Sequence, residues 1–461
     1  MQKAPVLKVF PNTSLLSGEY RQVIDAINAH CLSSMGKELA EACAPICDLD
    51  GIRLLLSRTA QMQEIVSSGL PFPCTTYPDI AKPAGLLRIE GSTLAEGQFM
   101  EIALFLEVMR DMHSFFRNRI GVHPELAAIL ESAPYEPIIL ERINEVLDEH
   151  GKVRTSASPE LGRIRRSLQR SRIEADRLYG SILSKYRKQG YLTEAEESSR
   201  NGRRVIAIMA EQKRVLPGII HDTSATGKTA FLEPEEAVGV NNSIATLEHE
   251  EQKEIRRIMR QLTDSTRRFG PVLILYREQL GLMDFNRAKA IFSISINGTV
   301  PTIASEPFLK LKRARHPILF LQNKKLKKDT VPFDLELNEE NRILVISGPN
   351  AGGKTVCMKT SGVLQMMLQS GIPISAHESS EMGIFQNLFV DIGDSQSIEY
   401  ELSTYSSRLR HMREFLEHVD GNSLFLIDEF GTGSDPELGG ALAESFLEFF
   451  YEKKSFAIIT T

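Results

Sequence analysis

The sequence predicts two kinds of architecture: a mostly helical region with a long helical hairpin that carries a small β tip, followed by an α/β domain with a P-loop. Apolar residues recur every seven positions between 155 and 190, as in paired long helices. Short β-like runs separate this stretch from a second long helical stretch. From about residue 341, apolar strands alternate with helices, which is typical of a mostly parallel sheet covered on both faces.

A chain of 461 residues is too long for one hydrophobic core, so we expect several domains. Changes in sequence pattern predict a helical core, a lever hairpin with a β-containing clamp tip inside it, a connector and a P-loop domain. Their expected ranges are, in that order, 1–154, 155–280 (tip at about 191–234), 281–340 and 341–461. Each arm of about thirty residues would reach about 45 Å.

Composition sets limits on the protein's class. The apolar share of 42% and the charged share of 25% are ordinary for a globular protein, and the net charge of −6 does not indicate a nucleic-acid-binding chain. The five cysteines lack the spacing of a zinc site. Neither a long apolar run nor a secretory leader is evident, so we expect a cytoplasmic protein without a membrane segment.

Positive charge is concentrated in the predicted hairpin. Residues 160–188 contain nine basic and three acidic side chains, and the tip adds further basic residues. This concentration favours contact with a polyanion, although arginines that only solvate a long helix remain the alternative. The residues expected to contact nucleic acid are Arg163, Arg166, Arg170, Arg203, Arg204, Lys213 and Arg214.

The strongest motif is a P-loop between an expected strand at 343–347 and a helix. It reads Gly348-Pro349-Asn350-Ala351-Gly352-Gly353-Lys354-Thr355 and matches every fixed position of the pattern. In such a loop, backbone amides and the helix N-terminus face the phosphates of ATP. Lys354 is expected to reach the β- and γ-phosphates, and Thr355 to bind Mg²⁺. A second Gly-Lys-Thr, at 227–229, lacks both the first glycine of the P-loop pattern and the helix that should follow it, so we do not expect a phosphate site there.

A second motif ends a buried strand with two carboxylates. Leu424 to Ile427 is apolar, and Asp428 and Glu429 follow directly. Asp428 suits the Mg²⁺ shell, and Glu429 suits the base that activates the attacking water. Further strands of the same sheet are expected at 372–375 and 456–460.

Several segments together resemble the MutS family of ATPases. They are Asp428 to Pro436 with Gly439 to Ala443, Asp391 to Ile398, Leu402 to Ser406, and Ala314 to Pro317. Within that family, Gly218 to Asp222 and Leu232 to Pro234 resemble the MutS type 2 branch. The resemblance covers most of the chain from about residue 30.

The resemblance implies an ABC-type ATPase that pairs head to tail as a homodimer. Ser403 would then meet the γ-phosphate of the partner's nucleotide, Asp435 would lie at the shared interface, and Phe333 would stack on adenine. The helical hairpin would act as the lever and clamp around nucleic acid. The family continues with a histidine after Thr461, and its type 2 branch with a nuclease-like domain, so a truncated chain that hydrolyses ATP poorly is expected.

The function implied is an ATP-dependent clamp on branched or structured DNA that suppresses recombination, or a factor that rescues stalled ribosomes. The sequence does not choose between DNA and ribosome. Mismatch repair is an alternative, against which the absence of a mismatch-reading domain argues. A coiled-coil chromosome-structuring ATPase is another, against which arms of only about four heptads argue. The expected cofactors are ATP and Mg²⁺.

Overall fold

The computed structural model divides into two compact units. One comprises Met1–Asp79, Val108–Tyr135 and Leu275–Thr461, and the other Ile80–Glu107 and Glu136–Ile274. The residues that the structure describes are 5–11, 15–73, 76–349, 352–392, 412–413, 415–430 and 436–461.

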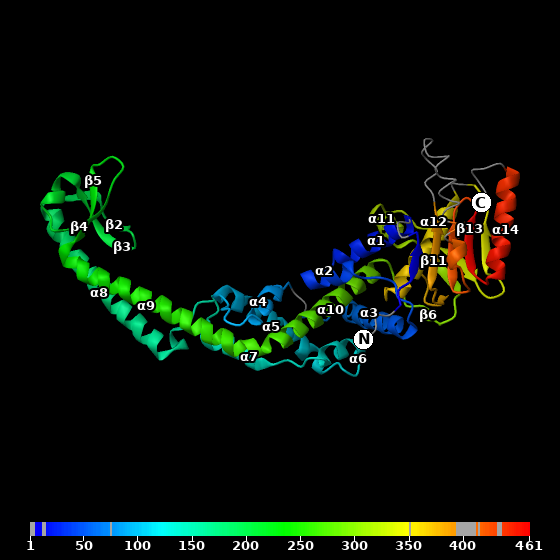
Figure 1. Cartoon of the computed structure of the whole chain (residues 1–461), viewed down its shortest axis with the longest axis horizontal. Helices are drawn as coiled ribbons and strands as arrows, with labels where there is room; N and C mark the ends of the chain where they lie inside the picture. Colours follow the sequence, from blue (N-terminus) through cyan, green and yellow to red (C-terminus); the bar gives the residue numbers. More distant parts are fainter. Residues whose placement is uncertain are drawn as a thin grey trace. The chain divides into compact units, whose positions relative to one another are not determined.

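A parallel sheet organises the C-terminal part of the first unit (Figure 1). Within the described residues it has five strands in the order β1-β11-β12-β13-β9, and each neighbouring pair is parallel. The strands are β1 (Lys8–Phe10), β11 (Asn387–Asp391), β12 (Ser423–Ile427), β13 (Phe456–Thr460) and β9 (Ile343–Ile346). Strands β11, β12 and β13 are buried along their whole length, as expected of a sheet covered on both faces.

Two helices cover opposite faces of this sheet. Alternate residues of a strand point to opposite faces, and on β12 Leu424 and Leu426 join the core beneath α12 (Lys354–Gln369), whereas Phe425 and Ile427 join the core beneath α14 (Pro436–Glu452). Figure 1 shows β13 between these two helices. The mixed α/β architecture expected for this region is therefore confirmed.

The strand expected at 372–375 is wrong. Ile374 makes only an isolated bridge with Thr299, because α12 ends immediately before it in a turn closed by Gly371. The apolar run is buried as an irregular segment and not as a member of the sheet. Strands β1 and β11 take part in the sheet instead, and neither was expected.

The rest of the first unit surrounds this domain with helices and a smaller sheet. That sheet has the order β6-β10-β7-β8, with strands Thr302–Ile303, Glu381–Met382, Leu309–Ala314 and Phe333–Leu337. The helices are α1 (Leu15–Asn28), α2 (Ser34–Glu41), α3 (Leu49–Ser67), α6 (Pro124–Glu131) and α11 (Pro317–Lys325). Helices α5 (Glu96–Arg117) and α10 (Gly270–Ser295) each have residues in both units.

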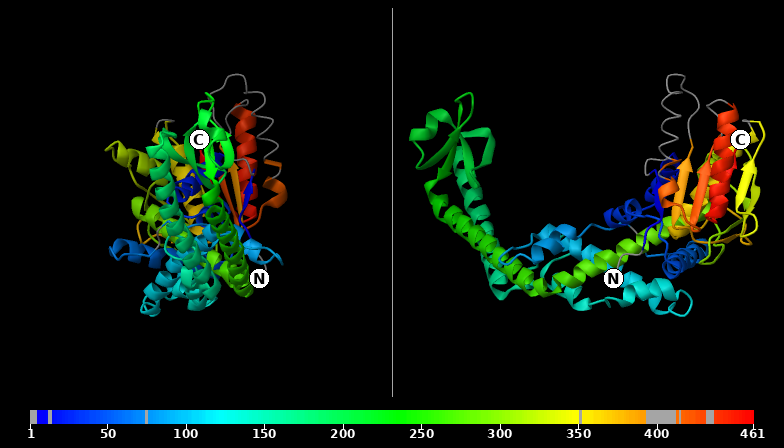
Figure 2. Two further views of the ribbon diagram at one scale, coloured as in Figure 1. Left: turned by 90° about the vertical axis from the view of Figure 1, so that its left-hand side faces the viewer. Right: turned by 45° about the vertical axis from the view of Figure 1, so that its right-hand side comes forward.

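The second unit is built around two long helices, α8 (Pro159–Lys188) and α9 (Glu235–Thr266). Ion pairs join Arg165 to Glu251 at 2.7 Å and Lys185 to Glu236 at 3.2 Å, so the helices run antiparallel. Figure 2 shows the pair leading to a small sheet. Helices α4 (Ala81–Leu87) and α7 (Pro137–Val146) also belong to this unit.

The small sheet lies between α8 and α9 in sequence and packs on them. Its order is β2-β3-β5-β4, with strands Leu192–Arg200, Arg203–Met209, Thr229–Pro234 and Gly218–Thr223. Ile206, Ile208 and Leu232 share a core with Tyr179 and Ile182 of α8. The strand β2 was not expected from the sequence, because only part of it is apolar.

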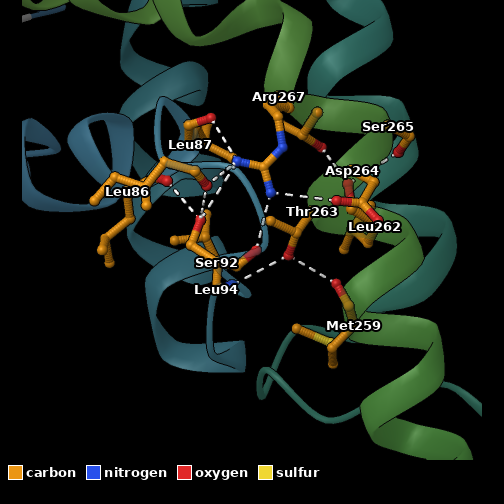
Figure 3. Close-up of polar contacts among 12 residues, drawn as sticks. Leu86, Leu87, Ser92, Leu94, Met259, Leu262, Thr263, Asp264, Ser265 and Arg267 are labelled. Atoms are coloured by element: carbon orange, nitrogen blue, oxygen red, sulfur yellow. Dashed lines mark hydrogen bonds and ion pairs between the residues drawn. The ribbon is translucent and has the colours of Figure 1, made fainter.

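The second long helical stretch of the hairpin, expected to run from about Glu235 to about Gln279, is not one unbroken helix. It is divided into α9, a short 3-10 turn at Arg267–Phe269 and α10, where Pro271 provides no backbone N–H. Figure 3 shows how this break is held: the Arg267 guanidinium donates to the carbonyl oxygens of Leu87 (2.9 Å) and Ser92 (3.0 Å), and Thr263 accepts from the Leu94 amide. No helix in the described part of the chain is long and apolar enough to span a membrane.

Candidate nucleotide site

The P-loop connects the end of β9 to the start of α12. Gly348 has a φ of +146° and Gly353, which caps α12, has a φ of +83°. A Cβ at either position would meet no atom within 4 Å, so the backbone conformation, and not lack of space, requires glycine there. The Gly352 amide donates to the Pro349 carbonyl at 2.9 Å. Asn350 and Ala351 lie outside the described residues.

Lys354 begins α12 and is almost buried, with 8% of its surface exposed. Its ammonium donates to the Gly348 carbonyl and, at 2.6 Å, to a backbone oxygen of Thr461. The lysine therefore lies folded over its own loop, beside the helix N-terminus, where an anion is favoured by the helix dipole.

A hydrogen bond links the P-loop helix to the carboxylate at the end of β12. Thr355 Oγ1 donates to Asp428 Oδ1 at 3.2 Å, and Thr460 Oγ1 at the end of β13 donates to the same oxygen. Asp428 is 6% exposed, and its backbone amide donates to Asp391 at the end of β11. The carboxyl ends of three neighbouring strands thus meet at the P-loop helix.

Glu429 occupies an unusual backbone position. Its φ is +50°, in the left-handed region that residues other than glycine rarely adopt. The Glu429 amide donates to Thr460 Oγ1 at 2.9 Å, and the next amide, of Phe430, donates to the Thr460 carbonyl at 2.9 Å. Thr460 therefore holds the turn in which both carboxylates lie. Strain of this kind is frequent at functional sites.

The oxygens of Thr355 and Asp428 suit a magnesium ion. Mg²⁺ prefers oxygen ligands, usually keeps several waters, and takes only one or two protein carboxylates. A hydroxyl and a carboxylate already within hydrogen-bond distance fit that pattern. Among the described residues no three carboxylate, histidine or cysteine side chains gather as a metal cluster, and a magnesium ion held mainly by phosphates and water does not require one.

Of the remaining residues expected at the nucleotide, only Phe333 lies within the described part. Phe333 begins β8 in the smaller sheet, opposite Ala314, and is half-buried against the main core. Ser403 and Asp435 lie outside the described residues.

An ion-pair cluster beside the P-loop helix was not expected from the sequence. Glu19 of α1 accepts hydrogen bonds from His316 at 2.9 Å and from Lys359 at 3.0 Å, and Lys359 lies one turn beyond Thr355 on α12. Burial would raise the pKa of the Glu19 carboxyl, but the hydrogen bonds from His316 and Lys359 outweigh it and lower that pKa. In the sequence, His316 is notable only as part of Ala314 to Pro317, one of the segments that carry the family resemblance.

Three of the seven basic residues expected to contact nucleic acid pair with acidic neighbours in the structure. Arg163 pairs with Glu160 at 2.7 Å, and Arg203 pairs with the buried Glu233 at 2.8 Å. Arg204 pairs with both Asp176 and Glu197. Within the described part of the chain, no ion pair involves the other four: Arg166, Arg170, Lys213 and Arg214.

Comparison with known proteins agrees with this geometry. Residues 344–461 match the family model of MutS domain V. The chain is 36% identical over 450 residues to the endonuclease MutS2 of Acetivibrio thermocellus, covering 96% of this chain and 55% of that protein. It is 36% identical over 454 residues to the endonuclease MutS2 of Bacillus velezensis, covering 97% of this chain and 56% of that protein. The chain thus spans about half the length of the curated relatives that it matches.

The Glu19 cluster predicts a pH-dependent contribution to stability. The pKa of the Glu19 carboxyl is lower in the folded protein than its ordinary value of 4.5, so the ionised carboxylate stabilises the fold at pH values above 4.5. This stabilisation is lost as the pH falls through the pKa that Glu19 has in the folded protein. We expect Glu19→Gln to lower the free energy of unfolding at neutral pH and to match the unaltered protein in acid. Urea unfolding over this pH range measures the difference.

The exposed Glu101, for which no ion pair is found within the described residues, provides the control variant Glu101→Gln. A deficit in Glu19→Gln that stayed constant from neutral pH to well below 4.5 would contradict the ion-pair interpretation.

Proposed function

Because the chain belongs to the MutS family and is of the MutS2 type, we propose that it uses ATP hydrolysis to control a clamp on branched or structured DNA. The observation that carries the ATPase part is the hydrogen bond of 3.2 Å between Thr355 and Asp428. It joins the P-loop hydroxyl that we propose binds magnesium to the carboxylate of the second motif, and phosphoryl transfer in P-loop enzymes uses such a pair.

Each group at the site has a role in this proposal. The P-loop amides and the start of α12 bind the phosphates, and Lys354 leaves the Gly348 carbonyl to contact the β- and γ-phosphate oxygens. Mg²⁺, bound through Thr355 and Asp428, would neutralise charge on these oxygens. Glu429, fixed by Thr460, orients and deprotonates the attacking water.

The site is proposed to be completed by a second copy of the chain. Ser403 would contact the γ-phosphate bound by the partner, and Asp435 would lie at the shared surface, as the family resemblance implies. Phe333 is retained as the proposed contact with adenine. The catalytic unit is then a homodimer formed through the domain at 341–461.

The second unit is the proposed clamp. We keep the boundaries 155–280 for the lever hairpin and 191–234 for its tip, with a helical core at 1–154 and a connector at 281–340. Lys213 and Arg214, next to each other in the tip, are the strongest candidates for phosphate contacts, because no acidic side chain in the described part neutralises them. Arg166 and Arg170 extend the same charge along α8. Arg163, Arg203 and Arg204 would have to break their ion pairs with acidic side chains before they could contact phosphates.

DNA is the proposed partner. The relatives are named endonucleases, which supports DNA as the ligand of this family branch. Counterion release from a phosphate backbone would supply most of the affinity, with weak dependence on base sequence. Rescue of stalled ribosomes would use the same basic surface, and competition between branched DNA and ribosomes distinguishes the two.

Two substitutions test the nucleotide chemistry. Lys354→Ala is expected to abolish ATP binding, because the loop loses the cation that contacts the phosphates. Glu429→Ala is expected to retain binding and to lower turnover by about 10²–10⁴-fold, the usual contribution of a general base. Binding of a fluorescent ATP analogue and phosphate release measure the two effects. Equal loss of binding in both variants would rule out Glu429 as the base.

Charge reversal at the tip tests the clamp. Lys213→Glu with Arg214→Glu is expected to weaken binding to any branched DNA and to reduce the slope of log affinity against log salt by about 0.9 for each lost contact. Lys327→Glu with Lys328→Glu, an equal charge change at two exposed lysines of the first unit, is the matched control. If both pairs gave the same affinity and salt slope, the tip would not be the DNA-binding surface.

A further inference from the structure

The C-terminal end of the P-loop helix, like its N-terminal end, is held by hydrogen bonds. Helix α12 ends in a Schellman motif: the Ile372 amide donates to the Met367 carbonyl at 2.9 Å and the Gly371 amide to the Leu368 carbonyl at 3.0 Å. Gly371 has a φ of +67°, and a Cβ there would lie 2.2 Å from Cβ of Leu55 on α3. Both the turn and the close approach of α3 therefore require glycine.

A buried lysine completes this end. Lys289 of α10 is 0% exposed, and its ammonium donates to the Gly371 carbonyl at 3.2 Å. Thr59 of α3 donates to the same oxygen at 3.0 Å. The ammonium therefore lies at the negative end of the α12 dipole, whereas the phosphates are expected at the positive end.

Few charges face this ammonium. Burial lowers the pKa of Lys289 to about 8, with smaller effects from Cys43, which raises it, and from Arg58 of α3, which lowers it. Burial also raises the pKa of the Cys43 thiol and of the Tyr20 hydroxyl that lies against it, so neither supplies a negative charge near neutral pH. The partners of the charge are thus the Gly371 carbonyl, at the negative end of the helix dipole, and the ring of Phe285, whose centroid lies 5.0 Å from the ammonium.

A lysine is a costly choice if stability alone is considered. A charge buried without a counterion disfavours folding, and an apolar side chain of similar volume is often neutral or stabilising. The Gly371 carbonyl also has a second donor in Thr59. On the same face of α10, Ser293 is fully buried and its hydroxyl has no hydrogen-bond partner in the described part of the chain.

We propose that Lys289 is a positioning residue, which fixes the far end of the P-loop helix and through that helix sets the phosphate-binding loop. This rests on the proposed ATPase function. Helix α12 has sixteen residues and is buried from Thr360 to Gln369, so it transmits a displacement at one end to the other as a rigid element. Helix α10 carries Lys289 in the first unit and begins, at Gly270, in the second. The lysine therefore links the helix that enters the clamp unit to the helix that begins at Lys354.

The test compares Lys289→Met with Ser293→Ala, which removes a buried hydroxyl one turn along the same face that makes no hydrogen bond in the described part of the chain. Amide hydrogen exchange is measured over residues 352–358, at the loop end of α12, without nucleotide. We expect Lys289→Met to speed exchange there by about threefold or more, since local opening becomes easier, and Ser293→Ala to leave it unchanged. Lys289→Gln, which keeps a polar group on this face, is the second variant should Lys289→Met fail to fold.

Activity and stability provide two further readouts. Turnover of ATP is expected to fall by about tenfold in Lys289→Met with KM little changed, because a slightly misplaced loop still binds. The unaltered protein should become more stable relative to Lys289→Met as pH increases from about 8 towards 10.5. In this range the unfolded chain still holds the Lys289 proton, whereas the folded chain has largely released it, so the free energy of unfolding rises with pH.

Unchanged exchange over 352–358, or a change confined to residues 371–374, would overturn the positioning role. Parallel losses of stability, ATP affinity and turnover would also overturn it, since that pattern is expected of a structural residue. An unaltered chain without ATPase activity would contradict the proposed function, whereas the exchange comparison would still decide this inference.

Discussion

The nucleotide site depends on the hydrogen bond between Thr355 of the P-loop helix and Asp428 at the end of β12. The two residues are 73 positions apart, and they meet because β9, β13 and β12 are neighbouring parallel strands whose carboxyl ends share one edge. Thr460 of the intervening strand donates to the same carboxylate oxygen and also holds the Glu429 turn. Loss of the strand order would separate the P-loop helix from Asp428 and Glu429.

The second unit is held together by different interactions from those at the nucleotide site. Its long helices are joined by charged pairs such as Arg172 with Glu248, at 2.7 Å, in addition to the apolar core beneath the small sheet. Most of these pairs are partly exposed, so each contributes little to stability. Their larger effect would be on the proposed binding of a polyanion, because they cancel charge that would otherwise face it. Four of the expected contact residues form no ion pair within the described residues and therefore define the proposed contact surface more narrowly than composition does: Lys213 and Arg214 in the tip, and Arg166 and Arg170 on α8.

Much of the P-loop domain could be predicted from the sequence, because its motifs are local. The P-loop, the strand ending in Asp428 and the strand at 456–460 each have an apolar run followed by an informative polar residue. Three features required the fold: that β13 lies between β9 and β12, that Lys8–Phe10 joins the sheet, and that Ile374 does not. The position of β13 depends on pairing between strands that are far apart in sequence. The runs around Lys8–Phe10 and Ile374 are too short or too irregular for a periodic pattern to distinguish a strand from a buried loop.

Charge was harder to predict than fold. The count over 160–188 suggested a free basic arm, but five of its nine basic residues pair with acidic residues, most of which come from α9 and from β2 of the tip. Two polar groups beside the P-loop helix were equally hidden. The buried Lys289 and the partly buried Glu19 occur in segments without a motif, and only packing brings them to this helix.

The most direct test of the account is the magnesium dependence of ATP affinity in Asp428→Asn. The neutral amide that this substitution introduces cannot bind Mg²⁺ as a carboxylate does, whereas the P-loop amides and Lys354 remain in place. The account predicts that Mg²⁺ tightens ATP binding in the unaltered protein, and that the variant binds ATP without Mg²⁺ equally well but loses most of the tightening. The same magnesium effect in both proteins would contradict the assignment of Thr355 and Asp428 as the metal-binding pair.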